Sequence, residues 1–415
     1  MDVHVVSKTD NNTHATFSLP PPTTPLAATS SSSSSSLRIR PSLLSLTSNN
    51  LTYALLGTQL HWWDAYPLPS NAPAPYNDAS AWGIVPAWGF GTPASGHIVD
   101  LALKHEPDEP ETHWIEVSPH RQTLLALYNR YLVSTSNSND ETRHAWEASV
   151  RPLWQCGYIL SSYVFTPDPV TNPAIHPYPG IPSVKETWSD SDADLSKAVV
   201  ISLAASSKTA RAVAHNFALR PANGGPLGLL QVTSAPAGIQ AAADALKAGF
   251  ATRAVDYTNL NSEEVARWIS ALKPAKIVVI DFGSRDGGFE AVHKLVKGDE
   301  ILAKAESVTV NIGNQQKIYT PSEVGAALSS AAEHGKIQFN TSPVLEAILA
   351  LQGATKLFAG LEEAWEHWLE NHEAAAPDLR FVWGEGVVGE KGIEGGWTRL
   401  TRGEVKPEKA LAFRI

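Results

Sequence analysis

KAVVISLAASSKTARAVAHNFALR, residues 197–220, is the stretch that decides the fold. It opens with a short β-branched run, Val199–Ile201, which is typical of a buried strand. Apolar residues then recur at the spacing of one helix face, at Ala210, Val213, Ala214 and Phe217. A strand, a tight turn and a helix in this order form the unit that holds pyrophosphate at a helix N-terminus in dinucleotide-binding domains.

Short apolar strands alternate with helices beyond this unit. Strands are expected at Val199–Ser202, Leu229–Thr233, Thr252–Asp256, Ile277–Asp281 and Val308–Ile312. Ser262 precedes two glutamates as a helix N-cap should, and Thr320 opens a capping-box sequence with proline at the first helical position. This alternation predicts an α/β fold with a Rossmann-like, doubly wound parallel sheet.

A chain of 415 residues is expected to form more than one domain. We predict an irregular β-rich domain over residues 1–190, a nucleotide-binding domain over 191–345, and a C-terminal segment, 346–415. The helix and strands of that last segment are expected to return to the first domain. Val3–Val6 is expected as an edge strand, and the proline- and serine-rich stretch at about 19–36 as an irregular loop that builds no core.

The composition limits the classes of function. Hydrophobic residues make up 43% of the chain and charged residues 18%, which are globular values. The net charge of -10 argues against nucleic-acid binding, and no apolar run reaches the roughly 18–20 residues of a membrane span. No secretory signal is evident at the N-terminus, so we expect a cytoplasmic protein. We also expect a small-molecule substrate, and a homodimer is left open.

Metal binding is not expected from the ligand-forming residues. The single cysteine, Cys156, excludes an internal disulfide and a cysteine-rich zinc site. The fourteen histidines show no metal-binding spacing.

The turn after the first parallel strand lacks glycine. Leu203, Ala205 and Lys208 stand where the pattern G-x-G-x-x-G is expected, and none of the turn residues takes a positive φ cheaply. Hydroxyl groups and one ammonium group are still available to a phosphate at the helix N-terminus. Two interpretations stay open, a modified phosphate turn or a structural turn that no longer binds nucleotide. The candidate cofactor-binding residues are Ser206, Ser207, Lys208 and Thr209.

The end of the second parallel strand bears on the type of cofactor. Thr233 and Ser234 follow the strand, where an NAD site usually has Asp or Glu for the ribose 2′-hydroxyl. The missing acid favours NADP over NAD and makes Ser234 a candidate cofactor contact. The alternative is an ordinary polar strand end.

Several blocks of the chain together resemble a known family. They are SLLSLTSNNLTYALLGTQLHWWDAY at 42–66, WGIVPAWGF at 82–90, HRQTLLALYNRYLV at 120–133, RPLW at 151–154 and SSKTA at 206–210. The family is an uncharacterised fungal and bacterial one, known only as a domain of unknown function. It looks like a remote branch of the zinc-independent medium-chain dehydrogenase/reductases, which include quinone and enoyl reductases.

The resemblance implies a GroES-like β domain beside a Rossmann domain, with NADPH and substrate in the cleft between them. It implies that SSKTA replaces the glycine-rich turn and that Tyr257 lies close to the cofactor. The zinc ligands of alcohol dehydrogenases are missing, which implies zinc-independent chemistry.

A reductase without zinc needs groups that stabilise the oxygen anion formed during reduction. Asn50 and Tyr53 are the candidate catalytic residues, because both can hydrogen-bond an oxygen and Tyr53 can also donate a proton. The alternative is that Asn50 caps a turn and Tyr53 packs in the first domain. An aromatic-rich zone lies nearby in sequence and either lines a substrate pocket or forms core: Trp62, Trp63, Tyr66, Trp82 and Trp88.

The leading hypothesis is a zinc-independent, NADPH-dependent oxidoreductase that reduces a small enone or carbonyl compound in secondary metabolism. The first alternative is a non-redox isomerase, cyclase or lyase that uses the same cleft. The second is a non-catalytic scaffold that has lost cofactor binding.

Overall fold

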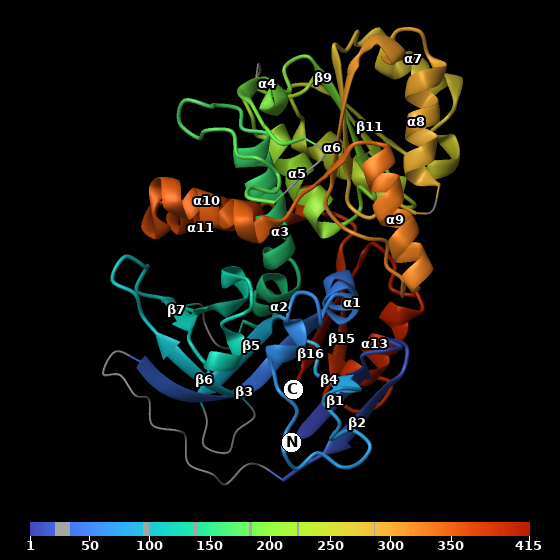
Figure 1. The fold of residues 1–415 in the computed structure, drawn as a ribbon. Coiled ribbons are helices and arrows are strands. Elements are labelled where there is room, and N and C mark those ends of the chain that lie inside the picture. The colour runs from blue at the N-terminus through green and yellow to red at the C-terminus, as the bar shows by residue number, and fades with distance from the viewer. Residues whose placement is uncertain (21–33, 94–98, 136–139, 182–184, 222–223, 286) are drawn as a thin grey trace.

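The computed structural model describes residues 1–20, 34–93, 99–135, 140–181, 185–221, 224–285 and 287–415. Figure 1 shows a part with a parallel sheet at the top and a β-rich part at the bottom, with helix α3 (Arg151–Ile159) running between them. The predicted fold class, a Rossmann-like doubly wound sheet beside an irregular β-rich domain, is confirmed.

The parallel sheet has the strand order β11-β10-β9-β12-β13-β14. Its strands are β9 (Ala198–Leu203), β10 (Gly228–Val232), β11 (Ala251–Val255), β12 (Lys276–Asp281), β13 (Glu306–Asn311) and β14 (Lys336–Gln338). The five expected strands are confirmed within two residues at each end. Strand β14 was missed because it has three residues and only Ile337 is apolar. From β9 the chain adds β10 and β11 on one side and then crosses to add β12, β13 and β14 on the other. The topological switch point therefore lies at the carboxyl ends of β9 and β12.

Both faces of this sheet are covered by helices. In β9, Val199 and Ile201 pack in the core that α7 (Glu263–Ala271) and α8 (Gly288–Gly298) form on one face of the sheet. Val200 packs in the core that α5 (Lys208–Ala218) forms on the other face. This alternation follows from the two-residue period of a strand and explains why β9 is apolar at successive positions. Helix α6 (Pro236–Leu246) lies on the α5 side, next to β11.

The expected helix starts are confirmed. The hydroxyl of Ser262 accepts a hydrogen bond from the Val265 backbone N–H, and α7 begins at the next residue. Helix α9 (Pro321–Glu333) begins with the Thr320–Glu323 capping box and has proline at its first position.

The β-rich part contains two sheets. The smaller is antiparallel, with the order β2-β1-β4, and consists of β1 (Asp2–Ser7), β2 (His14–Ser18) and β4 (Trp82–Gly83). The larger is mixed, with the order β15-β16-β3-β6-β7-β8, and β5 also pairs with β3. Its strands are β3 (Ser34–Leu46), β5 (Gly89–Pro93), β6 (Val99–Lys104), β7 (His113–Glu116), β8 (Arg130–Leu132), β15 (Arg380–Glu385) and β16 (Lys409–Arg414).

Two expectations for this part are wrong. Val3–Val6 is not an edge strand, because β1 pairs with β2 on one side and β4 on the other. The irregular loop expected to reach residue 36 ends earlier, because Ser34–Ser36 pairs with β6 as the start of β3. Residues 21–33 lie outside the described part of the chain.

The C-terminal segment ties the two parts together. β16 pairs with β3 in the larger sheet, and α13 (Ile393–Thr401) packs with α1 (Ser48–Leu55) in one hydrophobic core. Helix α11 (Ala354–Glu370) contacts α2 (Glu141–Ser149) and α3 through tryptophan rings, with 5.4 Å between the centroids of Trp154 and Trp365. The remaining α-helices are α4 (Asp190–Ala193), α10 (Thr341–Gln352) and α12 (His372–Ala375). Shorter helical segments occupy Trp62–Asp64, Pro119–Arg121, Ala126–Asn129, Leu160–Val164, Tyr257–Asn259 and Leu302–Lys304.

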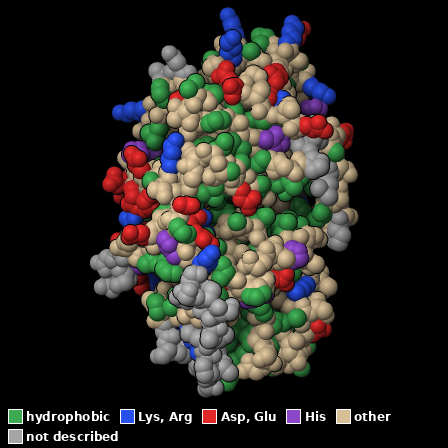
Figure 2. All heavy atoms as spheres, turned by 60° about the vertical axis from the view of Figure 1, so that its left-hand side comes forward, with side chains coloured by type: hydrophobic (Ala, Val, Ile, Leu, Met, Phe, Trp, Pro, Cys, Tyr) green, Lys and Arg blue, Asp and Glu red, His purple; other side chains and the backbone are tan. Residues whose placement is uncertain are grey.

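Over the described ranges, no single helix is long and apolar enough to cross a membrane; α10 and α11 meet that criterion only as a pair bent by 119°. Figure 2 shows acidic and basic side chains interspersed on the face that it presents.

Candidate functional site

The turn between β9 and α5 reverses through a left-handed residue. Ala204 has a φ of 55°, and its carbonyl accepts a hydrogen bond of 2.9 Å from the Ser207 backbone N–H. The turn therefore uses alanine where glycine is the ordinary choice, and the left-handed backbone costs about 1–2 kcal/mol. The reversal thought to need glycine is thus achieved, and other contacts must hold it.

Side chains from elsewhere hold this turn in place. The Tyr257 hydroxyl accepts a hydrogen bond of 3.0 Å from the Ala204 backbone N–H. The Thr233 hydroxyl donates to the Ser206 hydroxyl at 2.8 Å, and Arg211 Nε donates to the Ser206 carbonyl at 3.0 Å. The ends of β10 and β11 and the first turn of α5 thus converge on the turn.

The N-terminus of α5 offers backbone donors at the carboxyl edge of the sheet. Ser207 is the N-cap, and its hydroxyl accepts a hydrogen bond from the Ala210 N–H at 3.2 Å. Within the described residues, the N–H groups of Lys208 and Thr209 have no hydrogen-bond partner. Free N–H groups and the positive end of the helix dipole together favour an anion such as phosphate.

Lys208 adds an uncompensated positive charge to this helix end. Its side chain is half-buried and forms no ion pair with any described acid. Burial, together with the neighbouring Arg211 charge, lowers the pKa of Lys208 from 10.5 to about 8. Arg211 is in a different situation, because its guanidinium binds both carboxylate oxygens of Asp378, at 2.6 and 2.8 Å. Lys208 is therefore the cation of this turn that still lacks an anion.

The loop after β12 lies across the switch point from this turn. Asp281 is buried and accepts hydrogen bonds from the N–H groups of Gly283 and Ser284, at 3.0 and 2.7 Å. Gly283 has a φ of 105°, and a Cβ there would lie 2.3 Å from the Asn314 carbonyl oxygen. Close approach of the loops after β12 and β13 therefore requires glycine at this position.

The predicted cofactor residues are brought together by the fold. Ser206, Ser207, Lys208 and Thr209 form the turn and the start of α5, and Tyr257 hydrogen-bonds with the turn. Ser234 follows Thr233, which hydrogen-bonds with Ser206, and is half-buried. Their contact with a cofactor stays a prediction.

The predicted catalytic residues lie in the other part of the molecule, on α1. Asn50 is 1% exposed; its side-chain carbonyl accepts from the Thr47 N–H at 2.6 Å and its amide donates to the Pro86 carbonyl at 2.8 Å. This is a helix capping box. The Tyr53 hydroxyl accepts a hydrogen bond of 3.2 Å from Trp88 Nε1, and burial raises the pKa of Tyr53. Their catalytic role stays a prediction.

Helix α3 stands between the two predicted sets. Burial raises the pKa of the Cys156 thiol to about 11, although hydrogen bonds with Thr341 and Thr209 act in the opposite direction. The Cys156 thiol therefore joins α3 to the starts of α5 and α10.

Trp62 and Trp63 of the aromatic zone are core, whereas Tyr66, Trp82 and Trp88 are half-buried. Trp62 and Trp63 are each 5% exposed, and the Trp62 ring lies 4.5 Å from that of Tyr53 between centroids. Tyr128 closes the cluster with edge-on contacts to both Tyr53 and Trp62. Of the two interpretations, packing is the one that these contacts support for Trp62 and Trp63.

Sequence reasoning missed Arg211 and Asp378. The signal for Arg211 is a charged residue inside a helix whose neighbours are nearly all buried, with His215 four positions later on the same face. No comparable signal marks Asp378, which lies 167 positions away and meets Arg211 only in the folded chain.

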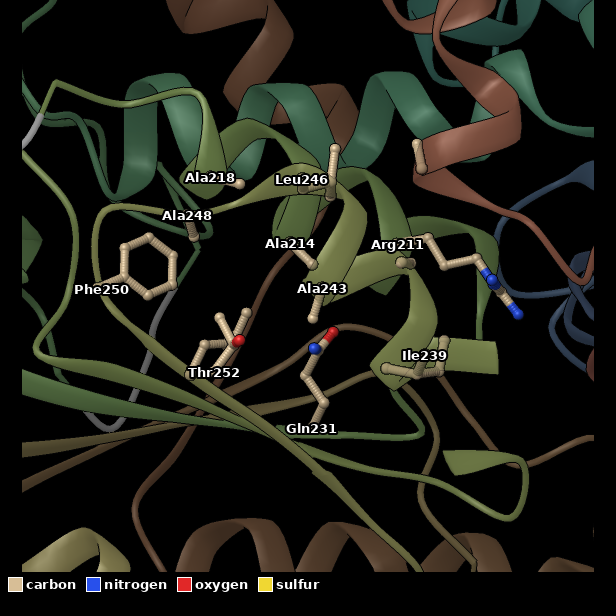
Figure 3. Close-up of a pocket in the computed structure, with 13 residues that line it drawn as sticks. Arg211, Ala214, Ala218, Gln231, Ile239, Ala243, Leu246, Ala248, Phe250 and Thr252 are labelled. Atoms are coloured by element: carbon tan, nitrogen blue, oxygen red, sulfur yellow. The ribbon is translucent and has the colours of Figure 1, made fainter. Parts of the chain in front are cut away.

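Two cavities lie away from the turn. One, of about 20 Å³, lies between α5, α6 and the sheet and is lined mainly by alanines and larger apolar side chains, with Arg211, Gln231 and Thr252 as the polar residues (Figure 3). Such a space holds about one water molecule. The other, of about 350 Å³, lies at the amino edge of the sheet beside Arg220 and Asp194. Across the described residues, no group of three or more His, Cys, Asp or Glu side chains is arranged to hold a metal ion.

A family model described as "Protein of unknown function (DUF2855)" matches residues 44–406. No curated protein matches the chain significantly. Among solved structures, CurA of Vibrio vulnificus in complex with NADPH is 11% identical, with a TM-score of 0.45 over 100% of this chain and 99% of that one. The mitochondrial 2-enoyl thioester reductase Etr1p/Etr2p heterodimer of Candida tropicalis is 11% identical, with a TM-score of 0.48 and the same coverage. The human synaptic vesicle membrane protein VAT-1 homolog-like protein is 12% identical, with a TM-score of 0.39, again at 100% and 99% coverage. Likenesses this remote carry no argument about function.

Proposed function

The chain belongs to the family described as "Protein of unknown function (DUF2855)", so its activity has to be argued from its own residues, and we propose that it is an NADPH-dependent reductase. The observation that carries this proposal is Lys208, a half-buried cation without an acidic partner among the described residues, at a helix N-terminus with free N–H groups. That helix end lies at the switch point of a parallel sheet, where dinucleotides bind in open α/β folds.

The residues of the turn fit the phosphate part of a dinucleotide. The Lys208 ammonium and the N–H groups at the start of α5 would hold pyrophosphate oxygens. Thr233 and Ser234 follow β10, so no carboxylate at this position repels a 2′-phosphate. The nearby Asp378 carboxylate is paired with Arg211, which compensates its negative charge. These features favour NADPH over NADH, and NADPH when bound would supply the hydride.

The chemistry is proposed to be independent of zinc. Thiolate, not thiol, binds zinc, and burial raises the pKa of the single cysteine, Cys156, to about 11. Burial also raises the pKa of Tyr53, so this phenol is protonated at neutral pH. It would donate its proton only to a strong base, which the oxygen anion formed by hydride transfer is. Tyr53 suits that role better than Asn50, whose amide oxygen and nitrogen are both already hydrogen-bonded.

The substrate class is a small enone or carbonyl compound, because such compounds accept a hydride at carbon and form an oxygen anion that a phenol can protonate. A setting in secondary metabolism, a cytoplasmic location and a homodimer stay predictions.

Equilibrium titration of the purified protein with NADPH and NADH tests the proposal. We expect tighter binding of NADPH, and a loss of about 10- to 100-fold in affinity for Lys208→Glu, because a charge-assisted contact is worth about 1.5–3 kcal/mol. Lys197→Glu is the matched control, since Lys197 is exposed beside the opposite end of β9 and should leave the affinity unchanged. If the wild-type protein binds neither nucleotide, the proposal fails and the non-redox enzyme or the scaffold remains.

A further inference from the structure

The phosphate turn is held at Ser206 from two directions. Its carbonyl accepts the hydrogen bond from Arg211 Nε, and its hydroxyl accepts the one from Thr233. Ser206 lies two residues after Ala204, the residue that takes a positive φ without being glycine. A bond that fixes Ser206 therefore also restrains the unfavourable backbone of Ala204.

Arg211 is itself fixed by the C-terminal segment. It is 3% exposed, and its two terminal nitrogens bind the two carboxylate oxygens of Asp378. Asp378 lies between α12 and β15, packed against the first turn of α6, where a Cβ on Gly238 would come within 2.4 Å of the carboxylate carbon. The carboxylate is thus enclosed between the first turns of α5 and α6.

The planar fork of arginine permits both contacts at once. Nε faces Ser206 while the terminal nitrogens face Asp378, a division that the single ammonium of lysine does not reproduce. Figure 3 shows the Arg211 guanidinium pointing out of the small cavity between α5, α6 and the sheet, so the cavity does not account for its orientation.

We propose that Arg211 and Asp378 are positioning residues that hold this glycine-free turn in its anion-binding shape. The role of this turn in binding a dinucleotide phosphate rests on the function proposed above. The C-terminal segment thereby contributes to the cofactor site indirectly, because Asp378 holds Arg211 and Arg211 holds the turn. This arrangement also explains how a phosphate turn persists without the glycines that normally form it.

Arg211→Lys tests this inference, because it keeps the positive charge and removes the fork. We expect hydrogen exchange of the hydrogen-bonded backbone amides of the turn, those of Ala204, Ala205 and Ser207, to speed up by about tenfold. The dissociation constants for NADPH and for pyrophosphate should rise by about five- to tenfold. Arg143→Lys is the matched control, since Arg143 also binds both carboxylate oxygens of one acid, Glu366, but joins α2 to α11. That control should leave both readouts at the turn unchanged.

A second substitution tests whether Arg211 acts by restraining the unfavourable backbone of Ala204 and not only by joining α5 to the C-terminal segment. Ala204→Gly in the Arg211→Lys background removes the backbone penalty, so exchange and affinity should return to within about twofold of the wild type. If Arg211→Lys does not fold, Asp378→Asn replaces it with the same expectations.

The inference is overturned if exchange at the turn is unchanged in Arg211→Lys, if Arg143→Lys changes it equally, or if Ala204→Gly gives no rescue. Failure of the wild type to bind NADPH would instead refute the proposed function, since the exchange measurement needs no ligand.

Discussion

The titration of Lys208 predicts how NADPH affinity depends on pH. The pKa of this side chain is lowered from 10.5 to about 8, first by burial and then by the Arg211 charge. A bound phosphate restores the charged form, so the ligand binds the protein in which Lys208 is protonated. Affinity is therefore expected to fall as pH rises through the lowered pKa and not through the ordinary value.

The magnitude follows from the fraction of charged lysine. With a pKa of about 8, roughly 90% of the Lys208 side chains are charged at about pH 7 and roughly 10% at about pH 9. The dissociation constant of NADPH should rise about tenfold over this range. The 2′-phosphate of NADPH titrates at about pH 6, below this range, and so contributes little to the change in the dissociation constant. Burial raises the pKa of Tyr257, which therefore keeps its proton over this range.

Fluorescence or calorimetric titration at several pH values measures this dependence, with two variants of Lys208 as controls. Lys208→Arg keeps its charge at every pH tested, so its profile should be flat with affinity retained. Lys208→Gln should bind weakly with a flat profile. A wild-type profile that is flat, or one that Lys208→Arg reproduces, would refute the role given to this ammonium.

Three further predictions concern stability. Gly157→Ala places a Cβ 2.7 Å from both the Ala212 side chain and the Thr209 carbonyl, so it should separate α3 from α5 and lower the free energy of unfolding by about 1–3 kcal/mol. The exposed helical glycine Gly325 has open space around it, so Gly325→Ala should raise that free energy by about 0.5–1 kcal/mol; thermal unfolding measures both, and equal shifts would contradict the packing argument. Burial lowers the pKa of His215 to about 4, so the unfolded chain binds its proton first and stability falls as pH drops below the unfolded value of 6.5. At about pH 5 this amounts to about 2 kcal/mol, and His215→Asn should show a correspondingly smaller acid loss in urea unfolding.

Much of the parallel-sheet part was predictable because its signals are local. A fully buried strand needs an unbroken apolar run, and a helix beside it needs an apolar face, so both appear in the sequence of β9 and α5. The caps of α7 and α9 were predictable for the same reason, since each cap and its partner lie within three residues. The strand β14 was not, because three residues carry too little pattern to distinguish a strand from a loop.

The β-rich part was predicted less well because its pairing is not local. Whether Val3–Val6 lies at an edge depends on β4, which pairs with it from more than seventy residues away. Asn50 shows a different limit, because its cap with Thr47 is local and was one of the two interpretations of this residue. Its amide is as suitable for holding a substrate oxygen as for capping a helix, and the sequence did not show that the amide nitrogen donates to the Pro86 carbonyl, 36 residues away.

The sequence by itself determined that this chain builds a doubly wound parallel sheet and that hydroxyls and one lysine stand at the turn after its first strand. It left open whether that turn keeps its shape without glycine, because the answer depends on groups far away in the chain. The tertiary structure decided this point: Ala204 adopts the left-handed backbone, and Tyr257, Thr233 and the Arg211–Asp378 pair converge on the turn. Spacing along the chain records local periodicity, whereas the contacts that offset a strained backbone exist only once distant segments have packed together.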